Sequence, residues 1–83
     1  MQPHNSLPSD PRARLTAVGE RMFGHWWRER MSGALGISRE TLRRWGVNPP
    51  ADLDARLIAA VDHELARGAE LRDLRAKLKA CAA

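Results

Sequence analysis

The sequence has a single cysteine, few aromatic residues and no long apolar run. Because Cys81 stands alone, a disulfide within one chain is excluded, and this cysteine usage fits a reducing compartment. No apolar run approaches the ~20 residues that a membrane-spanning helix needs. The opening residues, Met-Gln-Pro-His-Asn-Ser, lack the basic and apolar blocks of a signal peptide. We therefore expect a cytoplasmic protein without a membrane partner.

Patterns that indicate strands or catalysis are also scarce. β-branched residues are few and nowhere alternate, which favours an all-α fold. His63 and Glu64 match the first two residues of the zinc-protease HExxH motif, but position 67, where the motif requires its second histidine, is Arg67. The remaining histidines and the cysteine are too scattered for a recognisable metal-ligand spacing. With no phosphate-binding glycine loop and no nucleophile elbow either, the sequence predicts no enzyme, no metal and no cofactor.

Positive charge is concentrated in the first half of this 83-residue chain, which is long enough for one domain. Residues 12–46 hold eight arginines against three glutamates, a net charge of +5, whereas residues 47–83 hold six basic and six acidic residues. Asp10 supplies the remaining −1 of the formal net charge of +4. An excess of arginine in one half suits contact with phosphates, although a solvated arginine-rich surface has the same composition.

The stretch Met31–Trp45 has the pattern of two short helices joined by a tight turn. Met31 and Leu35 are four residues apart and share one helix face. Gly36 can end that helix by adopting a positive φ, which costs glycine no Cβ clash. Ser38 can then cap a second helix by accepting a hydrogen bond from a backbone N–H of its first turn.

The second helix of this stretch has one apolar and one charged face. Leu42 and Trp45 are three residues apart and point back towards the first helix. The opposite, solvent-facing side carries Arg39, Glu40, Arg43 and Arg44. Two short helices, a glycine turn and an arginine-rich outer face together predict a helix-turn-helix.

This stretch resembles the motif of phage-repressor and Cro-like helix-turn-helix proteins. The resemblance rests on the run Leu35-Gly36-Ile37-Ser38-Arg39, followed by Thr41, Leu42, Arg44 and Trp45. It is close over residues 28–47 and loose over residues 15–23, which correspond to the helix in front. Ser32 departs from the alanine that the family prefers, and Gly33 is a poor helix former. The resemblance implies a regulator whose second motif helix enters the DNA major groove.

Residue roles follow from the docking geometry of that motif. The second helix approaches base edges with its N-terminal residues, where arginine can bind guanine and glutamate can accept from cytosine. Base contacts are expected from Ser38, Arg39, Glu40, Arg43 and Arg44. Phosphate contacts are expected from Arg28, Arg30 and Thr41. The alternative is an ordinary solvated surface in which Arg39 and Arg43 pair with Glu40.

The segments in front of the motif predict a flexible arm over residues 1–9 and then a helix. Asp10 and Pro11 suit its N-cap and first turn, and the helix ends near Gly24. Within it, Gly19 indicates the close approach of another helix. The next helix should run from about Trp26 to Leu35, with Trp27 in the core. Trp26 points elsewhere and either half-covers the loop after the first helix or stands exposed at the rim. A DNA-binding core is thus expected over residues 10–50.

Residues 51–80 are expected to complete the core and to dimerise. Asn48, Pro49 and Pro50 stop the preceding helix, and another begins near Ala51 or Asp52. Core positions are expected at Leu53, Leu57, Ala60 or Val61, and Leu65. Beyond them, a homodimer contact is expected at Leu71, Leu74 and Leu78. Gly68 either separates two helices or lies within one long helix, and we favour two.

These observations predict an all-α fold of four to five short helices, a helix-turn-helix with C-terminal dimerisation helices. The predicted function is a sequence-specific regulator of transcription, a repressor or autorepressor that occupies an inverted-repeat operator in double-stranded DNA as a homodimer. No small-molecule ligand is expected. The alternative is a protein-interaction module, such as an antitoxin or inhibitor that covers a partner protein through residues 52–80. RNA binding is disfavoured because the chain lacks an aromatic stacking platform.

Overall fold

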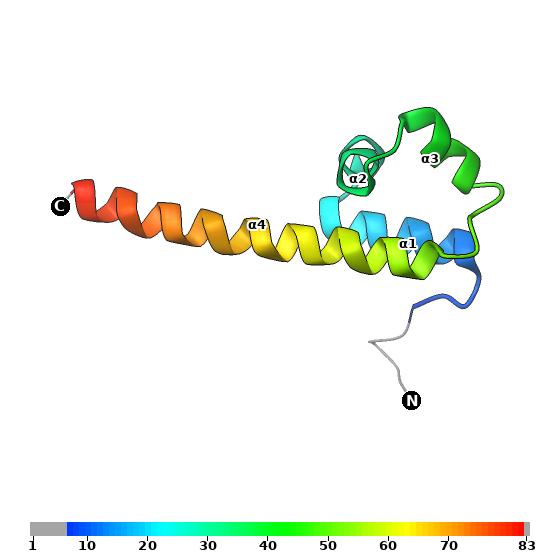
Figure 1. Cartoon of the computed structure of the whole chain (residues 1–83), viewed down its shortest axis with the longest axis horizontal. Helices are drawn as coiled ribbons and strands as arrows, with labels where there is room; N and C mark the ends of the chain where they lie inside the picture. Colours follow the sequence, from blue (N-terminus) through cyan, green and yellow to red (C-terminus); the bar gives the residue numbers. More distant parts are fainter. Residues whose placement is uncertain (1–6, 83) are drawn as a thin grey trace.

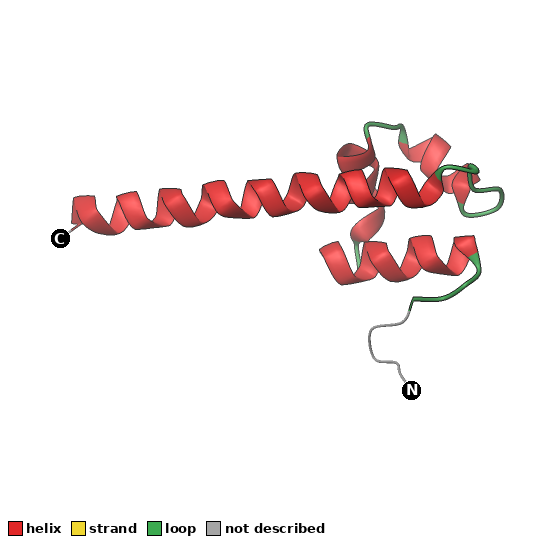
Figure 2. Ribbon diagram, turned by 60° about the horizontal axis from the view of Figure 1, so that its bottom comes forward, coloured by secondary structure: helices red, strands yellow, loops and turns green. Residues whose placement is uncertain are grey.

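The computed structural model describes residues 7–82, which form four α-helices and no strand. These are α1 (Pro11–Phe23), α2 (Trp27–Leu35), α3 (Arg39–Trp45) and α4 (Leu53–Ala82). α1 runs alongside the first half of α4 in the same direction, α2 packs against both, and α3 packs on α2 (Figures 1 and 2). The predicted all-α class is confirmed, but α4, with 30 residues, is not a short helix.

Both ends of α1 form as the sequence predicts. The Asp10 carboxylate accepts a hydrogen bond of 3.1 Å from the backbone N–H of Ala13, and Pro11 occupies the first turn. Gly24 ends the helix with a φ of +81°, and its N–H donates to the Glu20 carbonyl at 2.8 Å. Each of these caps forms hydrogen bonds within one helical turn, so the residues at the helix end are sufficient to predict it.

The core lies where α1, α2 and α4 meet and extends to the inward face of α3. Trp27 is 3% exposed and lies against Gly19, where an added Cβ would overlap the indole ring. The neighbouring Trp26 is 82% exposed. The predictions of a buried Trp27 and a close approach at Gly19 are therefore confirmed, and of the two positions left open for Trp26 the structure has the exposed one. The buried apolar residues are Leu15, Trp27, Met31, Leu42, Trp45, Leu53, Leu57 and Ala60.

The prediction of two helices after residue 51 was wrong, because α4 continues through Gly68 without a break. Positive φ occurs only at Gly24 and Gly36 among the described glycines, so Gly68 does not form a left-handed cap. A helical glycine costs about 1 kcal/mol relative to alanine, which the surrounding alanine, leucine, arginine and glutamate residues offset. Within residues 7–82, no helix is both long and apolar enough to span a bilayer.

The predicted core stripe of α4 ends earlier than expected. Leu53, Leu57 and Ala60 are buried and Val61 is half-buried, but Leu65 is 64% exposed, so its core assignment was wrong. The reason is the direction in which Leu65 points: at about 100° per residue it lies outside the side of α4 shared by Leu53, Leu57 and Ala60. The nearby His63, Glu64 and Arg67 still face Phe23 of α1 and Ala34 of α2. α1 has 13 residues and α2 has 9, so they span only about 20 Å and 14 Å. The second half of α4 projects beyond them (Figure 1).

Arg14 holds the segment before α1 and the start of α4 together. Its Nη1 donates to the carbonyls of Pro8 and Ser9, both at 2.9 Å, and its Nε lies 2.8 Å from Asp54 Oδ1. One of the arginines counted in the positive half is therefore used within the fold. Of the predicted flexible arm, residues 1–6 lie outside the described part of the chain.

Two glycine-to-alanine substitutions are expected to change stability in opposite directions. Gly68→Ala should raise the free energy of unfolding by about 0.5–1 kcal/mol, because the nearest atom to an added Cβ is a terminal nitrogen of Arg72, 3.9 Å away. Gly19→Ala should lower it by about 1–3 kcal/mol, since the methyl group displaces Trp27. Urea denaturation followed by circular dichroism measures both. A stabilising Gly19→Ala would contradict the packing described here.

Candidate nucleic-acid interface

The turn between α2 and α3 is a Schellman motif. Gly36 has a φ of +70° and lies in the left-handed region. Its N–H donates to the Gly33 carbonyl at 3.2 Å, and the N–H of Ile37 donates to the Ser32 carbonyl at 3.0 Å. Ser32 is buried, and its hydroxyl donates to the Glu29 carbonyl at 2.8 Å. Ser32 is thus accommodated in the packed interior with its hydroxyl hydrogen-bonded.

α3 begins at the serine cap that the sequence predicts. The Ser38 hydroxyl accepts a hydrogen bond of 3.1 Å from the Thr41 backbone N–H and donates to Thr41 Oγ1 at 3.0 Å. This exchange fixes the start of α3 and orients both side chains. It also engages the Ser38 hydroxyl, so any base contact by Ser38 competes with the cap.

α3 separates apolar from charged residues by face. Leu42 is 3% and Trp45 is 9% exposed, and both contribute to the core. On the other side, the arginine side chains of α3 are between 73% and 76% exposed, and that of Glu40 is 54% exposed. The outward residues are the four predicted from the sequence, namely Arg39, Glu40, Arg43 and Arg44.

The outward charges form ion pairs with one another and with α2. Arg43 Nη2 lies 2.6 Å from Glu40 Oε2, and Arg44 Nε lies 4.0 Å from the same oxygen. Arg39 pairs with Glu29 of α2 at 3.8 Å rather than with Glu40. Hydrogen bonds from Arg43, with its positive charge, lower the pKa of Glu40, so this carboxylate stays ionised at neutral pH. Exposed pairs of this kind contribute only about 0–1 kcal/mol, so a phosphate or base can displace them at little cost.

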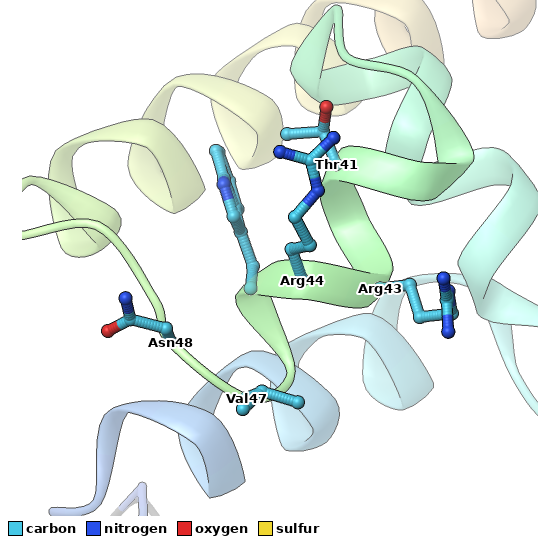
Figure 3. A pocket seen from close by; sticks show the side chains of 6 residues that line it. Thr41, Arg43, Arg44, Val47 and Asn48 are labelled. Atoms are coloured by element: carbon cyan, nitrogen blue, oxygen red, sulfur yellow. The ribbon is translucent and has the colours of Figure 1, made fainter.

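An open hollow lies along one side of α3 and the loop that follows it (Figure 3). Thr41, Arg43 and Arg44 line it from α3, with Thr41 and Arg44 close to each other and Arg43 apart from them (Figure 3). Val47 and Asn48 line it from the loop. The two arginines at the end of α3 therefore belong to one charged surface, and both lie within 4.0 Å of the same Glu40 oxygen.

The predicted phosphate-binding residues do not all gather on this surface. Arg28 is exposed near the start of α2, with its guanidinium carbon 4.7 Å from the centroid of the Trp27 ring. Thr41 lines the hollow beside α3. Arg30 instead lines a second hollow, where α2 faces His63 and Arg67 of α4. The structure thus separates Arg30 from the arginines of α3.

Sequence reasoning missed three residues of this region. Glu29 holds Arg39, Asn48 lines the hollow, and Arg56 of α4 lies over the Trp45 ring at 5.4 Å. Contacts between separate helices leave no periodic signal in the sequence, so Glu29 and Arg56 could not be found from it. Asn48 could have been proposed, because it is a polar residue in the loop that follows a candidate DNA-contacting helix. No protein-family model, no curated protein and no solved structure matches this chain.

Proposed function

We propose that this protein is a sequence-specific double-stranded DNA-binding regulator of transcription in which α2 and α3 act as a helix-turn-helix. The observation that carries the proposal is the division of α3, which buries Leu42 and Trp45 and projects three arginines and Glu40 from one open surface. Phosphates and guanine edges are the ligands that clustered exposed arginines bind best. A short helix held on the outside of a small core can enter a groove without obstruction.

The dimensions of α3 agree with major-groove binding. An α-helix with its side chains is about 10–12 Å in diameter, and the major groove is about 12 Å wide, so α3 fits within it. Arg39 and Glu40, in the first turn, are the residues nearest the base edges in the usual docking of such a helix. Arg43 follows one turn later on the same exposed side, and Arg44 with Thr41 is placed to contact the backbone or the groove edge.

Repression by occupancy is the mode of action that we propose. A seven-residue helix reads only a few base pairs, so specificity on a genome requires two copies on two half-sites. A homodimer on an inverted repeat provides this. Bound across a promoter, such a dimer prevents transcription without any ligand or cofactor.

Binding to the DNA upstream of the protein's own gene tests the proposal. Gel-shift titrations at fixed salt concentration should give an affinity at least about 10³-fold higher for one segment than for random DNA. If no segment is preferred and the affinity depends on salt alone, the sequence-specific function is wrong. Selection from a random DNA pool then provides the half-site and its spacing.

Arg28→Ala is expected to weaken binding to operator and to random DNA by similar factors. Arg28 is exposed near the start of α2, on the helix that does not enter the groove, so we assign it a phosphate contact. The slope of log affinity against log salt concentration should fall by about one. Arg72→Ala, which removes the same charge from the distal half of α4, is the matched control and should leave the slope unchanged. A loss confined to the operator would instead assign Arg28 to base contacts.

A protein-interaction module is the second candidate function. It is favoured by exposed leucines on α4, since Leu71, Leu74 and Leu78 are each more than half exposed. In this alternative, an antitoxin or inhibitor covers its partner with the distal half of α4. A pull-down with Leu74→Glu as the control distinguishes the two: specific retention of one protein, together with no preference for any DNA, supports the alternative.

A further inference from the structure

The exposed leucines of α4 continue the face that the core already uses. We call Leu71, Leu74 and Leu78 the leucine stripe; their exposed fractions are 56%, 52% and 62%. At about 100° per residue, the stripe lies on the same side of α4 as Leu53 and Leu57. α1 and α2 cover this side up to Ala60, and nothing among the described residues covers it beyond Arg67.

We propose that the leucine stripe packs against the leucine stripe of a second copy of this chain, with the two α4 helices antiparallel. Leu71 then lies opposite the partner's Leu74, and Leu78 lies opposite the aliphatic part of the partner's Arg67. The pairing deepens the homodimer of the proposed function, and only its consequence for operator spacing rests on DNA binding.

The positions of α1 and α2 oppose a parallel arrangement. In a parallel pair, the first half of the partner's α4 approaches the side of α4 where Leu57 and Ala60 are buried. α1 and α2 already occupy that side. In the antiparallel pair, this side meets only the end of the partner's α4, where Ala80, Cys81 and Ala82 are small. That end arrives at the open hollow lined by Phe23, Arg30, Gly33, Ala34, His63, Glu64 and Arg67.

Charge along the stripe supports the same orientation. Glu64 and Arg67 lie on the line of the stripe, so a parallel pair places each of them opposite its own copy, which is repulsive. The antiparallel pair places them opposite Cys81 and Leu78 of the partner instead. At one edge of the contact between the two α4 helices, Glu70 then lies beside the partner's Lys77. This pair occurs twice because the contact is symmetric.

The charges of Glu70 and Lys77 also favour one register between the two α4 helices. Sliding one helix by a heptad in one direction places Lys77 beside the partner's Lys77. Sliding it in the other direction places Glu70 beside the partner's Glu70 and forces the stripe onto the covered side near Ala60. The register with Leu71 opposite the partner's Leu74 is therefore the one that joins unlike charges and buries all three leucines.

This arrangement separates the two DNA-binding surfaces. With the twofold axis between residues 72 and 73, the Leu57 positions of the two copies lie about 47 Å apart along the helices. In one copy, α3 lies near the start of α4, away from its C-terminal end (Figure 1). Half-sites are therefore expected further apart than the ~34 Å of one DNA turn.

Disulfide trapping tests the orientation without DNA. In the antiparallel register, Cys81 lies opposite the partner's Glu64 and, at ~1.5 Å per residue, about 26 Å from the partner's Cys81. Wild-type protein oxidised with glutathione disulfide should therefore give little cross-linked dimer. Mixed with a chain carrying Glu64→Cys and Cys81→Ser, it should give a mixed disulfide dimer. Efficient cross-linking of wild-type protein alone would demonstrate a parallel pair and overturn the proposal.

Sedimentation tests whether the leucine stripe is the interface. The contact is small, so we expect a dissociation constant on the order of micromolar and dissociation on dilution. Leu74→Glu should weaken self-association by at least about 100-fold, because it buries an unpaired carboxylate. Leu65→Glu is the matched control: Leu65 is similarly exposed at 64%, but it lies on the opposite side of α4 and should have no effect. Monomeric wild-type protein at about 500 μM, or an unaffected Leu74→Glu dimer, would refute the pairing even if operator binding is confirmed.

Discussion

Trp27→Ala is expected to remove a substantial part of the protein's stability. Trp27 is 3% exposed, fills the space beside Gly19 and packs next to Met31, which is fully buried. Removing a buried tryptophan costs about 3–5 kcal/mol. At roughly 0.05–0.15 kcal/mol per residue, a chain of 83 residues is stabilised by only about 4–12 kcal/mol. The substitution therefore removes between a quarter and all of the stability, which urea denaturation followed by circular dichroism measures.

The adjacent tryptophan provides the control for this prediction. Trp26 is 82% exposed, so Trp26→Ala removes the same side chain one position earlier without opening a cavity. Its free energy of unfolding should stay within about 0.5 kcal/mol of wild type. Equal destabilisation by the two substitutions would mean that the rim and core assignments of this pair are wrong.

The sequence predicts the helix ends and the inward face of α3 well, because both depend on residues within a turn or two of the same helix. Asp10, Gly24, Gly36 and Ser38 each satisfy backbone groups within one turn, so the residue type and its neighbours are sufficient to identify them. Apolar spacing likewise identifies the inward face of α3, because a 3.6-residue period leaves few arrangements that bury both Leu42 and Trp45.

Predictions fail where the outcome depends on which side of a helix its neighbours cover. Leu65 was assigned to the core by its spacing, yet at about 100° per residue it lies about 80° around α4 from Leu57, outside the side that α1 and α2 cover. Gly68 is a similar case, because helix continuation depends on the balance of propensities around it rather than on one residue. Ion-pair partners are harder still: Arg39 pairs with Glu29 across two helices, although Glu40 is its sequence neighbour.

The same limit applies to the candidate site. The sequence identifies which side chains of α3 face outward, since this is a property of one helix. It does not separate Arg30, which faces α4, from Arg28, because that requires the packing of α2 between its neighbours. Nor does it show that Arg43 and Arg44 both line one hollow together with Val47 and Asn48 of the following loop (Figure 3).

Arg39→Ala and Arg43→Ala are each expected to weaken operator binding by about 1–3 kcal/mol, which is about 5-fold to 150-fold. Both side chains are 76% exposed on the outward face of α3, and their ion pairs with Glu29 and Glu40 are weak enough to exchange for a guanine edge. Each substitution should also relax base preference at one position of the half-site. Fluorescence anisotropy with operator variants, each changed at one base pair, measures both effects.

Comparison with Arg72→Ala separates base reading from loss of charge. That variant has the same net charge as the other two, but its substitution lies on α4, away from α3, so its operator preference should equal that of wild type. A phosphate role for Arg39 or Arg43 would lower operator and random-DNA affinity together, whereas a base-reading role lowers the operator affinity alone. Unchanged operator affinity in both α3 variants, with circular dichroism identical to wild type, would exclude the outward face of α3 as the surface that reads DNA.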